Sequence, residues 1–192
     1  MSTKKNKIKL NIYLLPIIFV GFLTAIDQLT KYIITSKLAL YETIPVIKDV
    51  FAITYIQNEG VAWGMFQGGR IIFLILTILV LLMCFYIYSN IAEKREFLPL
   101  RIGIIVLMAG ALGNMIDRIN LGYVVDFLSF ELINFPVFNV ADIYVVISMI
   151  FVFILIAFKY NDDDIDTIIG IKAKKKSPEV SDDNKEDNNG NN

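Results

Sequence analysis

Four long apolar segments, separated by polar stretches, set the pattern of this chain. A helix that crosses a bilayer needs about 20 mostly apolar residues. Two of the segments nearly reach that length alone, and the other two reach it when their polar ends are included. The sequence therefore predicts transmembrane helices over about 12–30, 70–89, 99–118 and 139–160.

The composition agrees with a membrane protein. Of the 192 residues, 56% are hydrophobic and 19% are charged, and the mean hydropathy of +0.60 is one that few soluble domains reach. No small-residue cleavage site follows the first apolar segment, and the chain continues in a helical pattern as DQLTKYIITSKL. We therefore interpret that segment as a spanning helix and not as a cleavable signal peptide.

The positively charged residues predict how the helices are oriented. Lysines and arginines gather before the first segment, in the link NIAEKREFLPLR and after the fourth segment. The two other loops are longer and carry only scattered ones. Because short loops rich in Lys and Arg stay in the cytoplasm, we expect both termini to be cytoplasmic and the two longer loops to lie on the outer face.

The first outer loop and the C-terminal tail differ in composition. The stretch IPVIKDVFAITYI is rich in β-branched and aromatic residues, so we expect one or two strands in a small sheet at the outer surface. Residues 161–192 are polar, charged and low in complexity, and we expect a disordered cytoplasmic tail. The predicted fold class is an all-α membrane protein with one four-helix transmembrane domain over residues 1–160.

The residue types that are missing exclude several chemistries. The chain has no histidine, and its single cysteine, Cys84, lies within the second apolar segment, where it is expected to pack as a small apolar side chain. Ser-His-Asp and Cys-His catalysis, His/Cys zinc sites and structural disulfides are therefore excluded. The remaining candidates are Asp, Glu, Lys, Arg, Ser, Asn and the backbone.

Polar residues in and beside the apolar segments all fall on the predicted outer side. The aspartates and asparagines did not enter the Lys and Arg count, so their placement is an independent observation. In chain order the polar residues are Asp27, Asn58, Asn114, Asp117, Arg118, Asp126, Asn139 and Asp142. Ionisable residues close to hydrocarbon are costly and are commonly functional, so we expect a site at the outer ends of the helices.

Simpler interpretations exist for several of these residues. Asn139 and Asp142 fit a capping pattern at the start of the fourth helix. Asp27 and Lys31 are spaced i, i+4 and could form an interfacial ion pair. Asp126 is the hardest to explain in this way, because apolar residues flank it on both sides in GYVVDFLSF.

Asp126 and Asp142 together suggest a specific chemistry. Two carboxylates held close together cannot both ionise, so one keeps a proton. One carboxylate then acts as a base that activates water, and the other acts as an acid. This is aspartic peptidase chemistry, which needs neither histidine nor metal, so we expect a catalytic dyad without a metal or cofactor.

Five short motifs together resemble one known family. In order they are DQLTKYII, NEGVAWGMF, GALGNMIDR, GYVVDFLSF and FNVADIYVVIS, and they cover about 27–142. Their order and spacing are similar to those of the lipoprotein signal peptidases (signal peptidase II). The resemblance implies an aspartic endopeptidase of the bacterial plasma membrane, with its site, a β-cradle and a surface helix on the extracytoplasmic face. It also implies cleavage of prolipoproteins immediately before a diacylglyceryl-modified cysteine.

The resemblance assigns roles to particular residues. It makes Asp126 and Asp142 the catalytic dyad. It gives a supporting or shaping role to Asp27, Lys31, Asn58, Gly60, Asn114, Arg118 and Asn139. Val61 and Gln57 depart from the residues common in the family, in the part that shapes the substrate groove. The implied partners are diacylglyceryl-modified prolipoproteins and membrane lipids, without nucleic acid, and we expect a monomer.

Other classes of function stay open on the residues alone. An ion-coupled transporter would hold its carboxylates near the membrane midplane, on discontinuous helices. A lipid phosphotransferase would cluster several carboxylates around Mg²⁺. A purely structural membrane protein would leave the clustering of polar residues unexplained, and a Ser-Lys peptidase built on Ser36 or Ser129 has no motif behind it.

Overall fold

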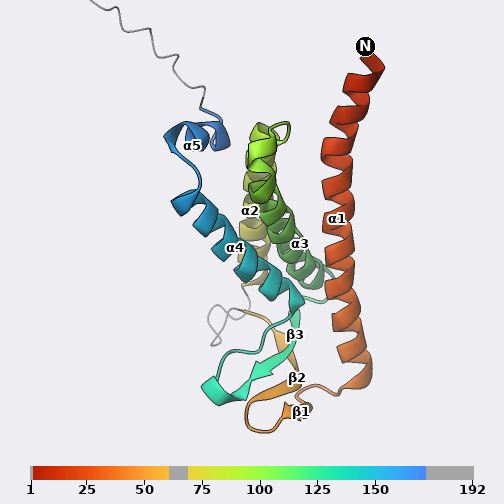
Figure 1. Cartoon of the computed structure of the whole chain (residues 1–192). Helices are drawn as coiled ribbons and strands as arrows, with labels where there is room; N and C mark the ends of the chain where they lie inside the picture. Colours follow the sequence, from red (N-terminus) through yellow and green to blue (C-terminus); the bar gives the residue numbers. More distant parts are fainter. Residues whose placement is uncertain (1, 61–68, 172–192) are drawn as a thin grey trace, which may run out of the picture.

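The protein is a helical bundle with a small sheet at one end (Figure 1). The structure, a computed structural model, describes the backbone of residues 2–60 and 69–171 and side chains from residue 12 onward. Within these residues, four helices are long and apolar enough to cross a membrane. They are α1 (Ser2–Lys37), α2 (Arg70–Ile91), α3 (Leu98–Asn120) and α4 (Val140–Phe158). Four apolar helices of spanning length are therefore present, as predicted, although α1 continues well past its expected end.

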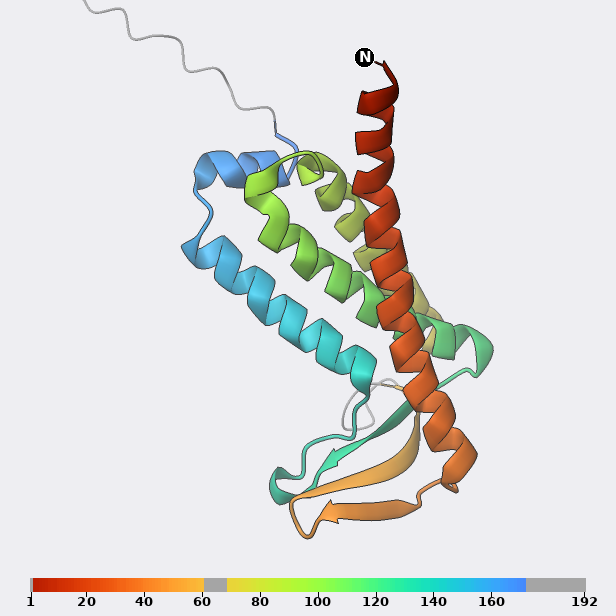
Figure 2. The same ribbon diagram turned by 45° about the vertical axis from the view of Figure 1, so that its right-hand side comes forward.

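Three antiparallel strands form the sheet, in the order β1-β2-β3. They are β1 (Thr43–Ile47), β2 (Phe51–Asn58) and β3 (Val124–Phe130). One or two strands were expected in the first loop, and two, β1 and β2, are present. The third was not predicted, and it places Asp126 on a strand opposite Ile56 of β2. The sheet lies at the end of the bundle opposite both described ends of the chain, in agreement between Figures 1 and 2.

Close packing between α3 and α4 depends on small residues. A Cβ atom added at Gly110 of α3 would lie 2.5 Å from the carbonyl oxygen of Ala141 in α4. Gly113 lies one turn further on, and its added Cβ would lie 2.5 Å from the Asp27 carboxylate of α1. Small residues let membrane helices approach closely where no hydrophobic effect drives association. The two glycines therefore bring α1, α3 and α4 together at the sheet end.

The start of the C-terminal tail differs from the sequence prediction. We expected disorder from residue 161, but Asp162–Ile168 form the helix α5, and Asn161 and Asp164 form a capping box at its start. Ile168 is buried against α2 and the turn η2 (Arg95–Phe97). Asn90 donates a hydrogen bond to the Ile168 carbonyl at 3.1 Å. Capping and apolar burial thus order this segment despite its charge, and residues 172–192 lie outside the described part.

Replacing Gly110 with alanine tests the helix contact. The added methyl group meets backbone that cannot rotate away, so we expect Gly110→Ala to lower the free energy of unfolding by about 1–3 kcal/mol. Urea unfolding in detergent micelles, followed by circular dichroism, measures the change. The control is Gly21→Ala, since no atom lies within 4 Å of a Cβ at Gly21. Equal stability of the two variants would contradict the packing argument.

Candidate active site

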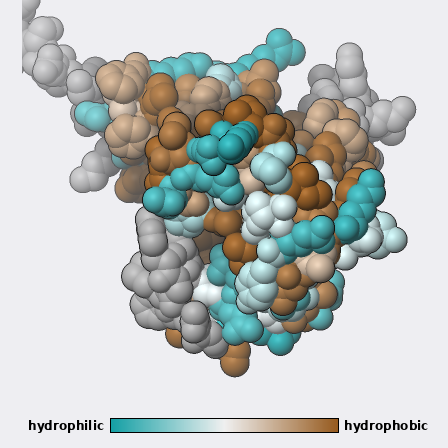
Figure 3. Space-filling view, turned by 90° about the horizontal axis from the view of Figure 1, so that it is seen from below, coloured by the Kyte–Doolittle hydropathy of each residue, from teal (hydrophilic) through white to brown (hydrophobic). Residues whose placement is uncertain are grey.

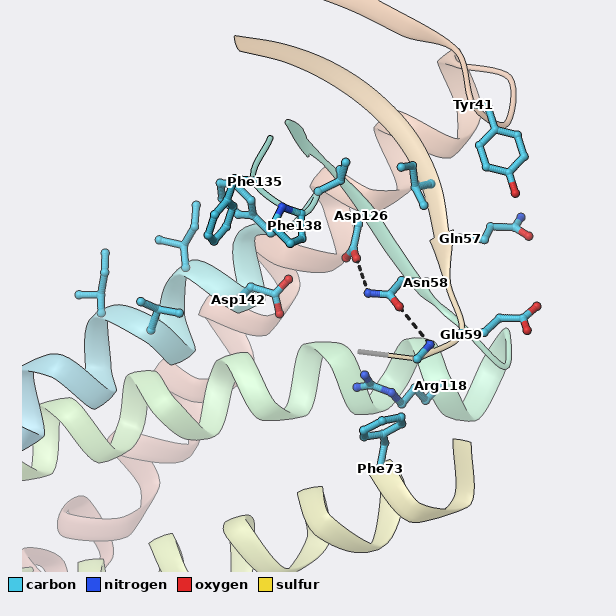
Figure 4. A pocket seen from close by; sticks show the side chains of 17 residues that line it. Tyr41, Gln57, Asn58, Glu59, Phe73, Arg118, Asp126, Phe135, Phe138 and Asp142 are labelled. Atoms are coloured by element: carbon cyan, nitrogen blue, oxygen red, sulfur yellow. Dashed lines mark hydrogen bonds between the residues drawn. The ribbon is translucent and has the colours of Figure 1, made fainter. Parts of the chain in front are cut away.

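Asp126 and Asp142 come from different elements and line the same cavity. Asp126 lies on β3, and Asp142 is the third residue of α4. The cavity has a volume of about 1110 Å³ and opens where the sheet meets the ends of α3 and α4. In Figure 4 both carboxyl groups point into this space. The structure therefore brings together the two residues that the sequence singled out.

Two asparagine side chains hold the Asp126 carboxyl group. Asn58 Nδ2 donates to one oxygen at 2.8 Å, and Asn139 Nδ2 donates to the other at 2.6 Å. The side chain is almost fully buried. Burial and, next, the nearby Asp142 carboxylate raise the pKa of Asp126 to about 7, against the two hydrogen bonds and the Lys31 charge, which lower it. Asp126 is therefore partly protonated near neutral pH.

Asp142 caps the start of α4 and also lines the cavity. Its Oδ2 accepts the Asn139 backbone N–H at 3.1 Å, and its own N–H donates to the Asn139 side chain at 3.0 Å. This capping box is the one indicated by the sequence. The other carboxylate oxygen accepts from Asn114 Nδ2 at 2.7 Å. The capping role and the site role therefore coexist.

A buried lysine lies at the centre of the surrounding polar cluster. Lys31 Nζ is 2.9 Å from Asp27 and 2.9 Å from Asp117, and both partners are almost fully buried. It also donates to Asn114 Oδ1 at 3.0 Å. The sequence spacing predicted the Asp27–Lys31 pair, but as an interfacial one. The pair is instead enclosed by α1 and α3 and includes a second carboxylate.

The carboxylates of this cluster reach the backbone beside each dyad residue. Asp27 Oδ1 accepts the N–H of Ala141, which precedes Asp142, at 2.9 Å. Asp117 Oδ2 accepts the N–H of Val125, which precedes Asp126, at 3.1 Å. The lysine-centred cluster therefore fixes the backbone on which both dyad side chains are carried.

The remaining candidates occupy the cavity wall. Gly60 donates its N–H to Asn58 Oδ1 at 3.0 Å, which orients the asparagine that holds Asp126. Arg118 also lines the cavity, and its guanidinium lies over the Phe73 ring, 5.0 Å from the centroid (Figure 4). Gln57 lines the same cavity, and Val61 lies outside the described residues.

Two further residues complete the cluster and were not among the predicted site residues. Gln28 donates to Asp117 at 2.8 Å and to the Gly113 carbonyl at 3.1 Å. Asp117 was noted only as one of several polar residues at the end of the third helix. Helical spacing could have indicated the position of Asp117 in the site, since Asp117 lies one turn after Asn114.

Across residues 2–60 and 69–171, no group of three or more Asp, Glu or Cys residues is arranged to hold a metal ion.

Fold and site define a class of protein, namely a multi-pass membrane protein with two carboxyl groups, one buried and one half-buried, in one cavity at the sheet end of its helices. The sequence profile of the family described as signal peptidase (SPase) II matches residues 19–158. Lipoprotein signal peptidases are among the similar proteins. One from Clostridioides difficile (strain 630) is 40% identical over 145 residues, which cover 76% of this chain and 96% of that protein. One from Halothermothrix orenii is 44% identical over 124 residues, or 64% and 81% of the two chains.

Solved structures agree with the sequence comparison. A bacterial membrane enzyme determined at 1.9 Å by the in meso method has a TM-score of 0.66 and 34% identity. The match covers 77% of this chain and 96% of that one. A second such structure, at 2.3 Å, gives 0.65 and 34% over 85% and 94% of the chains. This chain belongs to the signal peptidase II family, and its class is therefore that of a membrane peptidase.

Removing the central charge tests the polar cluster. Lys31→Met leaves Asp27 and Asp117 buried without their cation, so we expect the free energy of unfolding to fall by about 3–5 kcal/mol. Urea unfolding in micelles measures it. The control is Lys37→Met, which removes an exposed lysine from the last turn of the same helix. A loss below about 1 kcal/mol, as for a surface pair, would contradict a buried structural role.

Proposed function

We propose that this chain removes signal peptides from prolipoproteins as an aspartic endopeptidase, with Asp126 and Asp142 as its catalytic dyad. The observation that carries the proposal is the pair of carboxyl groups in one cavity, Asp126 buried and Asp142 half-buried, each held by its own hydrogen bonds. Family membership supports the substrate class, because the similar proteins are lipoprotein signal peptidases.

One proton shared between the two carboxyl groups is enough for the reaction. The ionised carboxylate takes a proton from a water molecule, and the water oxygen attacks the scissile carbonyl carbon. The protonated carboxyl group donates its proton to the carbonyl oxygen. When the resulting gem-diol collapses, the carbon–nitrogen bond breaks and the leaving amine of the modified cysteine takes up a proton. A coupled pair titrates jointly, so either aspartate can begin as the base.

The environment of the dyad favours such sharing. Asp126 has a pKa of about 7 because it is buried and lies near Asp142, so it is partly protonated at neutral pH. Asp142 lies in the first turn of α4, where the helix dipole and the Asn139 N–H favour negative charge. Like charges close together in a buried site cannot both persist.

The position of the cavity suits a lipid-anchored substrate. A diacylglyceryl group keeps the substrate cysteine at the bilayer surface, and the dyad lies at the sheet end of the spanning helices. The cavity wall continues along α4 with apolar residues, Ile143, Val146 and Ile147. Figure 3 shows hydrophilic and hydrophobic residues interspersed over the sheet end, as expected at a membrane surface. We place this end at the extracytoplasmic face of a bacterial plasma membrane, and we propose that the enzyme works as a monomer.

Arg118 and Asn114 have separate roles in this proposal. The resemblance gives both residues a supporting or shaping role. Asn114 donates to Asp142 and accepts from Lys31 and Asn139, so it links the proposed dyad to the buried cluster. Arg118 faces the cavity over Phe73 and stays the candidate that contacts the substrate.

Substituting each aspartate in turn tests the dyad. We expect Asp126→Asn and Asp142→Asn each to lower kcat/KM for a diacylglyceryl-modified prolipoprotein by at least about 100-fold, because each removes a proton acceptor or donor. Cleavage followed by gel shift measures the rate, and EDTA should leave wild-type activity unchanged.

The matched control is Asp49→Asn. Asp49 is exposed at the β1–β2 turn with a positive φ of 58°, a conformation that asparagine also adopts. This variant should cleave as the wild type does. Retained cleavage in either dyad variant, or loss of cleavage with EDTA, would refute the metal-free aspartic mechanism.

A further inference from the structure

A second cavity lies in the other half of the bundle, away from the dyad. Its volume is about 630 Å³, and it is formed by α1 and α3 with Tyr88 of α2. Its apolar lining includes Leu15 and Phe19 of α1 and Ile102 and Ile105 of α3. Residues along α1 from Ile12 to Leu23 border it, a length of about 16 Å at the rise of an α-helix. This is about half of the roughly 30 Å hydrocarbon core, or one leaflet.

Of the two polar side chains that line this groove, Tyr88 is already engaged. Pro16 has no N–H, so the carbonyl of Ile12 lacks its usual helical partner. The Tyr88 hydroxyl donates to that carbonyl at 2.8 Å. The tyrosine thereby closes a backbone defect in α1 and leaves Arg101 as the polar group that is available to a ligand.

Arg101 retains unused hydrogen-bond donors. Its Nη1 donates to the Ala92 carbonyl at 2.6 Å, while its Nε is buried and has no hydrogen-bond partner. Among the described residues that line the groove, Arg101 is the one charged side chain. A guanidinium group presents several donors in a planar fork that matches phosphate oxygens. The groove thus combines an apolar channel with a phosphate-binding group at one end.

The sequence at the start of α1 is basic. It holds Lys4, Lys5, Lys7 and Lys9 and no acidic residue, whereas Lys94 and Arg95 of the α2–α3 link are balanced by Glu93 and Glu96. The acidic residues of α5 lie across the bundle from α1 in both ribbon views (Figures 1 and 2). Charge complementarity therefore favours an anionic occupant.

We propose that this groove is a binding site for an anionic glycerophospholipid, with one acyl chain between α1 and α3 and its phosphate at Arg101. A signal-peptide helix is the main competing occupant. Its start is positively charged, so the basic residues at this end would repel it. The lipid site is independent of the proposed chemistry, because neither Arg101 nor the groove belongs to the dyad cavity.

Native mass spectrometry of the purified full chain tests the site. The protein is exchanged into micelles with equal amounts of phosphatidylglycerol and phosphatidylcholine that have the same acyl chains. We expect the wild type to retain phosphatidylglycerol about fivefold over phosphatidylcholine, from one basic contact to the headgroup. Arg101→Gln should abolish that preference, and Arg101→Lys, which keeps the charge, should preserve most of it.

A second pair of variants tests the groove itself, in case Arg101→Gln fails to fold. Ile102→Trp fills the groove and should lower retention of both lipids. The control is Ile150→Trp, which adds the same bulk at an exposed position of α4 outside the groove. Equal retention by Ile102→Trp and its control, or equal preference in wild type and Arg101→Gln, would overturn the proposal. So would displacement of bound phosphatidylglycerol by a synthetic signal peptide with a basic start, which would assign the groove to that helix.

Discussion

The ammonium group of Lys31 is the contact on which the sheet end of the protein depends. It pairs with two buried carboxylates, one from α1 and one from α3, at 2.9 Å each. Burying ions is costly unless they are paired and their remaining hydrogen bonds are satisfied. Both conditions hold, since Asp27 and Asp117 also accept backbone N–H groups from α4 and β3. Four elements are thereby joined through one charge.

The same arrangement explains how Asp126 and Asp142, the proposed catalytic pair, are brought together from distant parts of the sequence. Ala141 and Val125 are the backbone donors to the cluster, and each immediately precedes a dyad aspartate. Asn114 and Asn139 then bond to each other and to the carboxyl groups of Asp142 and Asp126 respectively. A rigid supporting shell of this kind fixes reacting groups better than mobile loops do. The paired charges of the cluster thus hold the backbone beside the two aspartates that are proposed as the dyad.

The sequence predicted the parts of this structure that have local signals. The length of the apolar segments predicted the four helices, and β-branched residues predicted β1 and β2. Isolated carboxylates in apolar surroundings indicated Asp126 and Asp142 as site residues. Strand β3 was missed because a short apolar run becomes a strand only when β2 pairs with it. The i, i+4 spacing of Asp27 and Lys31 predicted their pairing but not its burial, which α3 provides through Asp117. Helix α5 was not predicted because its aspartates make the segment polar overall, although two of its isoleucines pack on the bundle.

The central claim is that burial and the nearby Asp142 raise the pKa of Asp126 to about 7, so that the proposed dyad can hold a proton near neutral pH, and infrared spectroscopy tests it most directly. The infrared band of a protonated carboxyl group is assigned to Asp126 by its absence from the Asp126→Asn variant. Its intensity is then measured as a function of pH in the wild type and in Asp142→Asn. The account predicts that this band persists to near pH 7 in the wild type, and to a lower pH in Asp142→Asn, where the neighbouring charge is gone. Loss of the band near pH 4, the ordinary range of an aspartate, in both proteins would contradict it.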